Sequence, residues 1–488
     1  MILAIDAGTT GVTAQIIDAD GALLGRGYHE VEQHFPKPGW VEHSPEQIWD
    51  ATLTAVKAAL FQADTGHDHI RAIGITNQRE TVAVWDRKTL KSPTNAIVWQ
   101  DRRTSGLLDE PRFHDAAGWV REATGLPLDP YFSSSKLLWM KRNLPQVWAG
   151  VTDGSLAVGT IDSYLAARIS GGAAHITDAS NASRTQLFNI HTLQWDDKLL
   201  ELFEVPKSAL PRVVSNSGQL AESAPSEFLG ISAPITGMAG DQQSALFGQL
   251  AHAEGQAKCT YGTGAFLLRN TGNKIVSTDP KLISTIAWLD ENGQPTYALE
   301  GSVFVAGAAI QWLRDGLQII EAASELEVLA GTVAYSGGVC LVPAFTGLGA
   351  PFWDPDVRGA MFGVTRGTSR GHLARATFEA LAFQVKALVD AMSVAVGQEL
   401  TSLKVDGGVT RSSLMMQLQA NALGIPIELP ANFDTTGLGA AFLAGLGAGV
   451  WTSTAELHQQ VAKTFVPAGN LDLEYHRWLR AVAAARAF

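Results

Sequence analysis

The chain has 488 residues, too many for a single hydrophobic core, so we expect two domains. Hydrophobic residues make up 46% and charged residues 17% of the sequence, a globular balance that excludes a disordered chain. The formal net charge of −12 disfavours a general nucleic-acid or anionic-membrane binder, but it is compatible with a small anionic ligand such as a nucleotide.

Cysteine content and the first residues indicate a cytoplasmic protein. Only Cys259 and Cys340 occur, so there is neither a disulfide framework nor a CxxC site. The opening MILAIDAGTT lacks the basic segment of a signal peptide, and Asp6 interrupts its apolar run. The most apolar late stretch, 437–451, is too short and too rich in glycine to span a membrane. We therefore expect no membrane partner.

The first predicted elements form a β-hairpin with a glycine- and threonine-rich tip. A strand at 2–5 leads through DAGTTG at 6–11 into a second strand at 12–17. The segment KCTYGTGAFLLRNTGN at 258–273 has the same layout about half the chain further on. The repeat predicts an ancient duplication, with two unrelated hairpins as the alternative.

Several helices are predicted between and after the strands. One begins after Ser44, with Pro45 at its first position and Gln47 completing a capping box. The segment 109–149 has the pattern of helices joined by Pro/Gly turns, and the last helix covers 474–488.

Polar loops follow two of the predicted strands of the first half. The strand 72–75 ends in TNQRE at 76–80, and a strand at 96–99 ends before QDRR at 100–103. Polar side chains at the ends of buried strands are typical of α/β active sites. This pattern favours a functional role for Arg79 and Glu80 over a surface ion pair. A further polar stretch, rich in Asn and Ser, covers 175–185.

A carboxylate flanked by amides lies near the middle of the chain. Asp241, Gln242 and Gln243 precede the Gly-Thr-Gly turn at 262–264. A positioned carboxylate and a turn whose backbone N–H groups can hold phosphate are parts that phosphoryl transfer needs. We expect the halves to meet here and place the domain border near Gly248, which gives domains of 1–248 and 249–488.

The second half offers one further phosphate-binding pattern and one ambiguous motif. The strand 403–405 runs into Asp-Gly-Gly at 406–408 and then a helix, a usual seat for a nucleotide. The string GTSRG at 367–371 matches GxSxG, but polar residues precede it, so Ser369 is interpreted as the cap of a helix near His372 rather than as a nucleophile.

Other nucleotide and metal motifs are absent from the sequence: there is no Gly-Lys pair of a P-loop, no HExxH and no zinc spacing. If ATP is bound, the two hairpins must hold its phosphates. Asp6, at the first strand end, is then the natural carboxylate for Mg²⁺ and its waters. Asp241 is the best candidate for a general base acting on an alcohol.

Over nearly its full length the sequence resembles the FGGY family of carbohydrate kinases. The two signatures characteristic of that family fall at 131–143 and 359–380. The other matching blocks are GITNQRET at 74–81, NAIVWQDRRT at 95–104, DPYFSSSKLLWM at 129–140, NASRTQLFNIHTLQWDD at 181–197, GDQQSALFGQ at 240–249, TYGTG at 260–264, ALEGSVFVAGAAIQWLRD at 298–315, LVPAFTGLGAPFWDPDVRG at 341–359 and KVDGG at 404–408.

The resemblance implies an α/β fold of two actin-like (ribonuclease-H-like) domains with an active-site cleft between them. It also implies ATP-dependent phosphorylation of glycerol to sn-glycerol 3-phosphate, with Asp241 as general base and Mg²⁺ bound with the ATP. Members of the family often form dimers or tetramers, so a homodimer or homotetramer is expected. The residues that would hold glycerol are Arg79, Glu80, Trp99, Tyr131, Asp241, Gln242 and Phe304. The residues that would contact the nucleotide are Thr9, Thr10, Gly11, Thr263, Gly307, Gln311, Gly408 and Ser412.

Three positions depart from the family pattern. The chain has DAGTTGVT where members acting on glycerol usually have DQGTTSSR, so Ala7 replaces a glutamine and Thr13 replaces an arginine that touches the phosphates. Ser412 stands where an asparagine usually contacts the nucleotide. Loss of the arginine weakens transfer by about a few kcal/mol if no other group replaces it.

These departures keep two alternatives open. One is a kinase for another polyol or sugar, such as erythritol or xylulose, and the other is a catalytically inactive actin-like sensor of nucleotide or polyol. Many relatives also carry a Gly/Arg loop for fructose 1,6-bisphosphate. Here AESAPSEFLGISAPITG at 221–237 has no basic residue, so we expect no site for that inhibitor.

Overall fold

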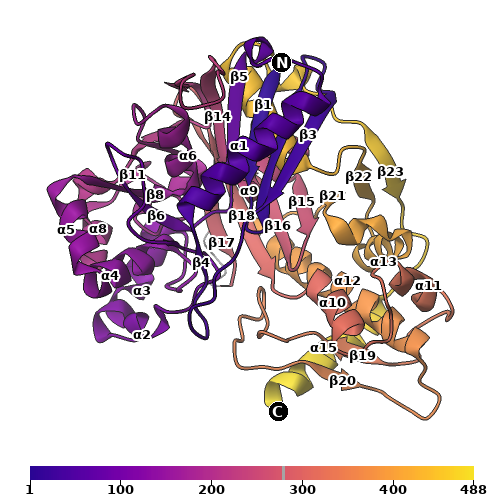
Figure 1. Ribbon diagram of the computed structural model, residues 1–488. Coiled ribbons are helices and arrows are strands. Elements are labelled where there is room, and N and C mark those ends of the chain that lie inside the picture. Colours follow the sequence, from indigo (N-terminus) through magenta and orange to yellow (C-terminus); the bar gives the residue numbers. More distant parts are fainter. Residues whose placement is uncertain (277–280) are drawn as a thin grey trace.

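The first half of the chain is built on a six-stranded sheet (Figure 1). The computed structural model describes residues 1–276 and 281–488. Three strands form an antiparallel meander, and two more continue the sheet in parallel with the first strand. In spatial order the strands are β13 (Ser217–Glu222), β14 (Pro234–Gly240), β5 (Ala72–Asn77), β1 (Ile2–Ala7), β2 (Gly11–Ile17) and β3 (Leu23–Glu30).

The second half repeats this arrangement in a seven-stranded sheet. The meander β15, β16 and β18 corresponds to β1, β2 and β3, and the parallel strands β21 and β22 correspond to β5 and β14. The repeated strand order is what a duplication would leave. In spatial order the strands are β17 (Ile283–Leu289), β18 (Pro295–Val303), β16 (Ala265–Gly272), β15 (Ala257–Tyr261), β21 (Leu403–Asp406), β22 (Ile427–Pro430) and β23 (Val461–Phe465).

Helices cover both faces of the first sheet. Side chains alternate along β1, so that Leu3 and Ile5 join the core under α1 (Pro45–Gln62), while Ile2 and Ala4 join the core under α14 (Thr435–Gly447). Although α14 comes from the second half of the sequence, it packs on β14, β1 and β5 and against α9 (Asp241–Gly248). The two halves are therefore joined by helix packing, and the domain border near Gly248 stays a prediction.

The remaining helices extend the two halves. A small four-stranded sheet and its helices form the lobe at the left of Figure 1: β4 (Glu42–His43), β7 (Ala96–Ile97), β6 (Val82–Asp86), β8 (Leu156–Thr160), α2 (Ser105–Leu108), α3 (Pro111–Thr124), α4 (Ser133–Asn143), α5 (Pro145–Asp153) and α8 (Asp197–Phe203). The others are α6 (Ile161–Ile169), α7 (Ala179–Ala182), α10 (Gly307–Asp315), α11 (Glu325–Ala330), α12 (Arg370–Val396), α13 (Ser413–Leu423) and α15 (Asp472–Ala487). Within 1–276 and 281–488, no helix is both long and apolar enough to cross a membrane.

The predicted cap of α1 is confirmed only in part. Ser44 is the N-cap, and its hydroxyl accepts a hydrogen bond from the backbone N–H of Gln47. The capping box is wrong, because the Gln47 carbonyl oxygen Oε1 is buried without a hydrogen-bond partner. Instead the Ser44 hydroxyl donates to the Glu46 carboxylate, 3.5 Å away.

The interpretation of Ser369 as a cap is confirmed. It is the N-cap of α12 in a complete capping box with His372, whose Nδ1 accepts the backbone N–H of Ser369 at 3.0 Å. We expect Ser369→Ala to lower the free energy of unfolding by about 1 kcal/mol, measured in urea, and to leave any enzymatic activity unchanged. The matched control is Ser324→Ala, because Ser324 precedes α11 without a capping hydrogen bond and its loss should change stability little. A serine nucleophile would instead lose all activity on this substitution.

Candidate active site

Arg79 and Glu80 lie in the turn after β5, behind Gln78, and are buried, with 2% and 1% of their surfaces exposed. The surface ion pair is therefore excluded. Glu80 has a backbone φ of +59°, in the left-handed region, which residues other than glycine adopt at an energetic cost. Its carbonyl oxygen accepts a hydrogen bond from the hydroxyl of Ser133, at the start of α4, at 3.0 Å. The strained turn is thus fixed from the neighbouring lobe.

Two more buried charges complete a cluster around this pair. The guanidinium of Arg79 donates to both oxygens of Glu300, at 2.5 and 3.0 Å. Arg184 donates to Glu80 at 2.7 Å and to Glu300 at 3.0 Å. Burial alone would raise the pKa of Glu300, but the guanidinium groups of Arg184 and Arg79 outweigh it and hold the pKa at about 2.

Asp241 is the first residue of α9 and faces this cluster. Its Oδ1 lies 3.1 Å from Nε of Arg79 and accepts the backbone N–H of Gln242 at 2.7 Å. The preceding residue, Gly240, allows the close approach, since a Cβ there would lie 2.7 Å from Cγ and Cδ of Arg79. With 28% of its side chain exposed, Asp241 is accessible to a small molecule.

The pKa of Asp241 is raised, and burial is the largest cause. Arg79 and Lys258 oppose this effect, whereas Glu300 adds to it. A carboxylate with a raised pKa at the edge of a buried cluster can take a proton from a hydroxyl group.

Lys258 approaches the same point from β15. Its ammonium group donates to Oε1 of Gln242 at 2.5 Å and to the hydroxyl of Thr260 at 2.9 Å. Burial lowers the pKa of Lys258, and the carboxylates of Asp406 and Asp241 raise it in part. The lysine therefore fixes the amide of Gln242 beside Asp241.

Two of the three aromatic residues expected at a polyol lie together. The rings of Trp99 and Tyr131 are 5.5 Å apart, edge to face. The indole N–H of Trp99 donates to the hydroxyl of Thr9 at 2.9 Å, which connects this pair to the first hairpin tip. Phe304 is 38% exposed, and the centre of its ring lies 6.0 Å from that of Trp353. Trp353 and Tyr131 pack against the same small hydrophobic cluster. Phe304 is therefore connected to Tyr131 through Trp353 and this cluster.

The second hairpin tip and the start of α10 are hydrogen-bonded to each other. The carbonyl of Thr263 accepts the backbone N–H groups of Ala306 and Ala308, at 2.8 and 3.0 Å, and Gly307 donates to Gly262 at 2.9 Å. Thr263 and Gly307 are therefore brought together. Gln311, one turn further along α10, is exposed.

The other predicted nucleotide contacts lie where β21 ends. A Cβ on Gly407 would lie 2.3 Å from the carbonyl oxygen of Tyr261, so Gly408 follows a point close to the second hairpin. Ser412 is the N-cap of α13, and its hydroxyl accepts the backbone N–H of Met415 at 3.2 Å. The hydroxyl of Ser412 thus has a structural role in this structure.

Asp6 is the last residue but one of β1 and lies just before the first hairpin tip, residues 9–11. Burial raises the pKa of Asp6 to about 8, and the nearby carboxylates of Asp241 and Asp434 add to this effect. Within the described ranges, no group of three or more His, Cys, Asp or Glu side chains is arranged to hold a metal ion by itself. A cation at Asp6 would need further ligands, such as phosphate oxygens and waters.

Sequence reasoning missed three charged residues of the cluster: Arg184, Glu300 and Lys258. A signal was present, since Lys258 and Glu300 are single charges inside the apolar strands AKCTY and PTYALEGSV. Arg184 belongs to the polar stretch 175–185, which the structure buries from Ile176 onwards. Charged residues in buried strands are costly unless they are paired, and so they point to a site.

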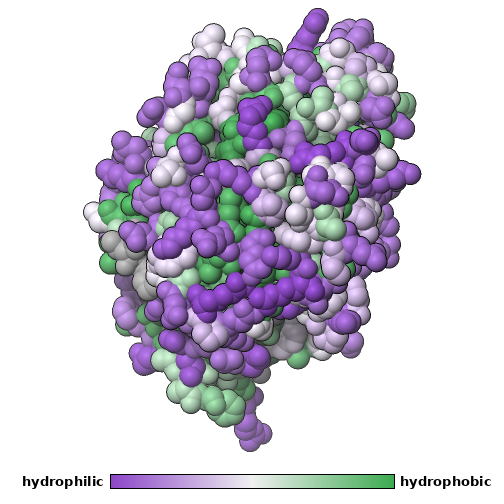
Figure 2. Space-filling model, turned by 90° about the vertical axis from the view of Figure 1, so that its left-hand side faces the viewer, coloured by the Kyte–Doolittle hydropathy of each residue, from purple (hydrophilic) through white to green (hydrophobic). Residues whose placement is uncertain are grey.

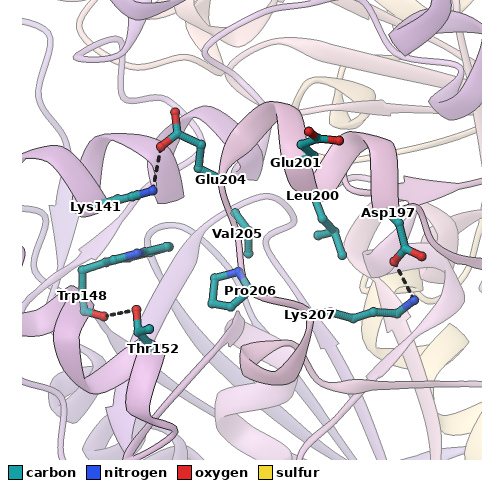
Figure 3. Close-up of a pocket in the computed structure, with 10 residues that line it drawn as sticks. All are labelled: Lys141, Trp148, Thr152, Asp197, Leu200, Glu201, Glu204, Val205, Pro206 and Lys207. Carbon is teal, nitrogen blue, oxygen red and sulfur yellow. Dashed lines mark hydrogen bonds and ion pairs between the residues drawn. The ribbon is translucent and has the colours of Figure 1, made fainter.

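A separate concavity of about 500 Å³ lies on the lobe at the left of Figure 1, between α4, α5 and α8 (Figure 3). Both of its lysines are already paired, Lys141 with Glu204 at 2.6 Å and Lys207 with Asp197 at 2.8 Å. It shares no residue with the cluster around Asp241.

Figure 2 shows the side of the molecule that is on the left in Figure 1, where apolar residues form separate patches between hydrophilic ones.

The sequence pattern of the FGGY family of carbohydrate kinases matches the chain twice, its N-terminal domain at 1–248 and its C-terminal domain at 257–448. A glycerol kinase of Bacillus cereus (strain ATCC 14579) is 49% identical over 492 residues, covering 100% of this chain and 99% of that protein. A glycerol kinase of Dechloromonas aromatica (strain RCB) is 52% identical over 456 residues, covering 93% of this chain and 90% of that protein.

Solved structures resemble the chain over its whole length. The crystal structure of Plasmodium falciparum glycerol kinase with ADP has a TM-score of 0.92 at 36% identity, covering 99% of this chain and 98% of that chain. A ligand-bound xylulose kinase from Lactobacillus acidophilus has a TM-score of 0.84 at 23% identity, covering 99% and 96%. The expected α/β class with two actin-like domains is confirmed.

Proposed function

Because the chain belongs to the FGGY family of carbohydrate kinases, we propose that it transfers the γ-phosphoryl group of ATP to glycerol and makes sn-glycerol 3-phosphate. The observation that carries the proposal is the position of Asp241, which lies 3.1 Å from Arg79 at the accessible edge of a buried ionic cluster. The relatives named glycerol kinase, at 49% and 52% identity, support the choice of acceptor.

In the proposed mechanism, Asp241 takes the proton from the attacking terminal hydroxyl. Arg79 orients the carboxylate through Nε, and Lys258 holds the side chain of Gln242 beside it. Arg79, Glu80 and Gln242 would bind the glycerol hydroxyls. Trp99, Tyr131 and Phe304 would pack on its carbon skeleton. Correct alignment of the hydroxyl with the phosphorus atom supplies much of the rate.

We propose that ATP lies between the two hairpin tips and the start of α10. Its contacts would be Thr9, Thr10, Gly11, Thr263, Gly307, Gln311, Gly408 and Ser412. Mg²⁺, when bound, supplies positive charge that offsets the charge of the phosphates. Asp6 suits it, because a carboxylate whose pKa is raised to about 8 among other carboxylates gains most from a cation and releases its proton on binding.

The proposal has three further parts. A domain border near Gly248 and a cytoplasmic location rest on the sequence pattern, and a homodimer or homotetramer rests on the family resemblance. A kinase for another polyol or sugar is the second candidate. Thr13 and Ala7, which depart from the usual pattern beside the phosphates, favour it.

The test is ADP release from Mg-ATP by the purified protein, with glycerol, erythritol, xylitol, D-xylulose or no acceptor. We expect strong turnover with glycerol and much weaker turnover with the others. The highest kcat/KM on a longer polyol would keep the family mechanism but change the acceptor. Nucleotide binding without ADP release on any acceptor would indicate the inactive sensor.

A further inference from the structure

We propose that Glu300 and Arg184 are positioning residues that fix the two side chains holding the acceptor, Arg79 and Glu80. With them they form a closed ring of four buried charges. The inference rests on the proposed function, since Arg79 and Glu80 matter here as acceptor contacts. It adds two residues that act on the acceptor through others.

Hydrogen bonds of 2.5 to 3.0 Å connect the side chain of Arg79 to that of Glu80 through Glu300 and Arg184. Nε of Arg79 and Oε1 of Glu80 are 3.9 Å apart, too far for a hydrogen bond. Glu300 instead accepts from both guanidinium groups, and Arg184 reaches Glu80 at 2.7 Å. The relative position of the two acceptor contacts is therefore set through Glu300 and Arg184.

Arg184 also contacts the aromatic residues on another side of the proposed acceptor site. Its guanidinium carbon lies 5.9 Å from the centre of the Tyr131 ring and 5.5 Å from that of Phe132. A guanidinium on an aromatic ring is an attractive contact that restricts both groups. Arg184 thus connects the strained turn at Glu80, the carboxylate of Glu300 and the aromatic side of the site.

The ring also connects the two halves of the chain. Arg79, Glu80 and Arg184 belong to the first half, whereas Glu300 lies on β18 of the second sheet. Two guanidinium groups face two carboxylates, so the charges of the ring balance. A buried ionic set of this kind often adds no stability over well-packed apolar residues. In this ring, short charge-assisted hydrogen bonds restrict where the four side chains lie. We assign it to the positioning of the acceptor.

The test uses the full-length enzyme and measures kcat and the KM values of glycerol and ATP separately. The substitution Glu300→Gln removes the bidentate carboxylate partner of Arg79. It also leaves one excess positive charge in the ring. We expect the KM of glycerol to rise about tenfold or more, because a displaced contact costs alignment, while the KM of ATP stays within about twofold. Discrimination between glycerol and erythritol should fall as well.

A charge-balanced double variant separates positioning from a general structural defect. Arg184→Gln leaves one excess negative charge, and Glu300→Gln with Arg184→Gln restores the balance. If the four groups act as a unit, the double variant raises the KM of glycerol by less than the product of the two single effects. The control is Lys207→Gln, which removes one charge of the exposed pair with Asp197 on the same half and should change neither KM.

Two results would overturn the inference: single effects that simply multiply, or KM values of glycerol and ATP that rise together. If Glu300→Gln does not fold, Arg184→Lys decides, because it keeps the charge but cannot bridge two carboxylates with a planar fork. That variant should raise the KM of glycerol and leave the KM of ATP unchanged. The proposed function fails separately, if the wild-type enzyme does not phosphorylate glycerol. The same ratios are then measured with the acceptor that it uses.

Discussion

Asp241→Asn is expected to lower kcat with glycerol by about 10²- to 10⁴-fold, the usual contribution of a general base. Asparagine keeps the size of the side chain and an oxygen that can accept the backbone N–H of Gln242, now at 2.7 Å, but it cannot take a proton. The KM of glycerol should change much less than kcat. The measurement is ADP release at saturating glycerol and Mg-ATP.

The pH profile of the wild-type enzyme gives an independent check on the same residue. Burial raises the pKa of Asp241, so the fraction of the active, ionised form falls as the pH drops through that raised pKa. We expect kcat/KM to fall on the acid side at a higher pH than for an ordinary carboxylate. Asp197→Asn, which changes an exposed carboxylate, should keep the wild-type rate and profile. Near-normal turnover of Asp241→Asn would show that another group accepts the proton.

Local patterns were enough to predict several parts of the site. The hairpins are visible in the sequence because glycine and threonine interrupt two apolar, β-prone runs. Arg79 and Glu80 are visible because they follow the strand 72–75, which the structure extends to Asn77. The residues that pair with them are not. Glu300 is 221 positions from Arg79, and a single charge in a strand does not say which distant charge it will meet.

The helix α14 shows the same limit for packing. From the sequence alone, 437–451 is predicted only as an apolar stretch too short to span a membrane. In the structure most of it belongs to α14, which packs on the sheet of the first half and against α9. Its glycines had no local explanation, because the reason for them is a helix from another part of the chain. Strand order and helix faces follow from such distant contacts, so they required the structure.

Gly439→Ala is expected to lower the free energy of unfolding by about 3 kcal/mol, at the upper end of the usual cost of overpacking. A Cβ on Gly439 would lie 1.9 Å from the backbone carbonyl oxygen of Ser244 in α9. Because the atom it meets is backbone, no rotation of a side chain can relieve the clash, and one of the two helices must move. Urea denaturation followed by circular dichroism measures the effect.

The matched control is Gly118→Ala in α3, where an added Cβ would meet nothing within 4 Å. Alanine in a helix interior is more favourable than glycine by about 0.5 to 1 kcal/mol, so this variant should be as stable as the wild type or slightly more stable. An equal response of the two variants would contradict tight packing of α14 on α9. Since α9 begins with Asp241, a shift of this helix also moves the proposed base. Gly439→Ala should therefore lower kcat in the fraction that stays folded, and this loss separates displacement of the base from simple loss of folded protein.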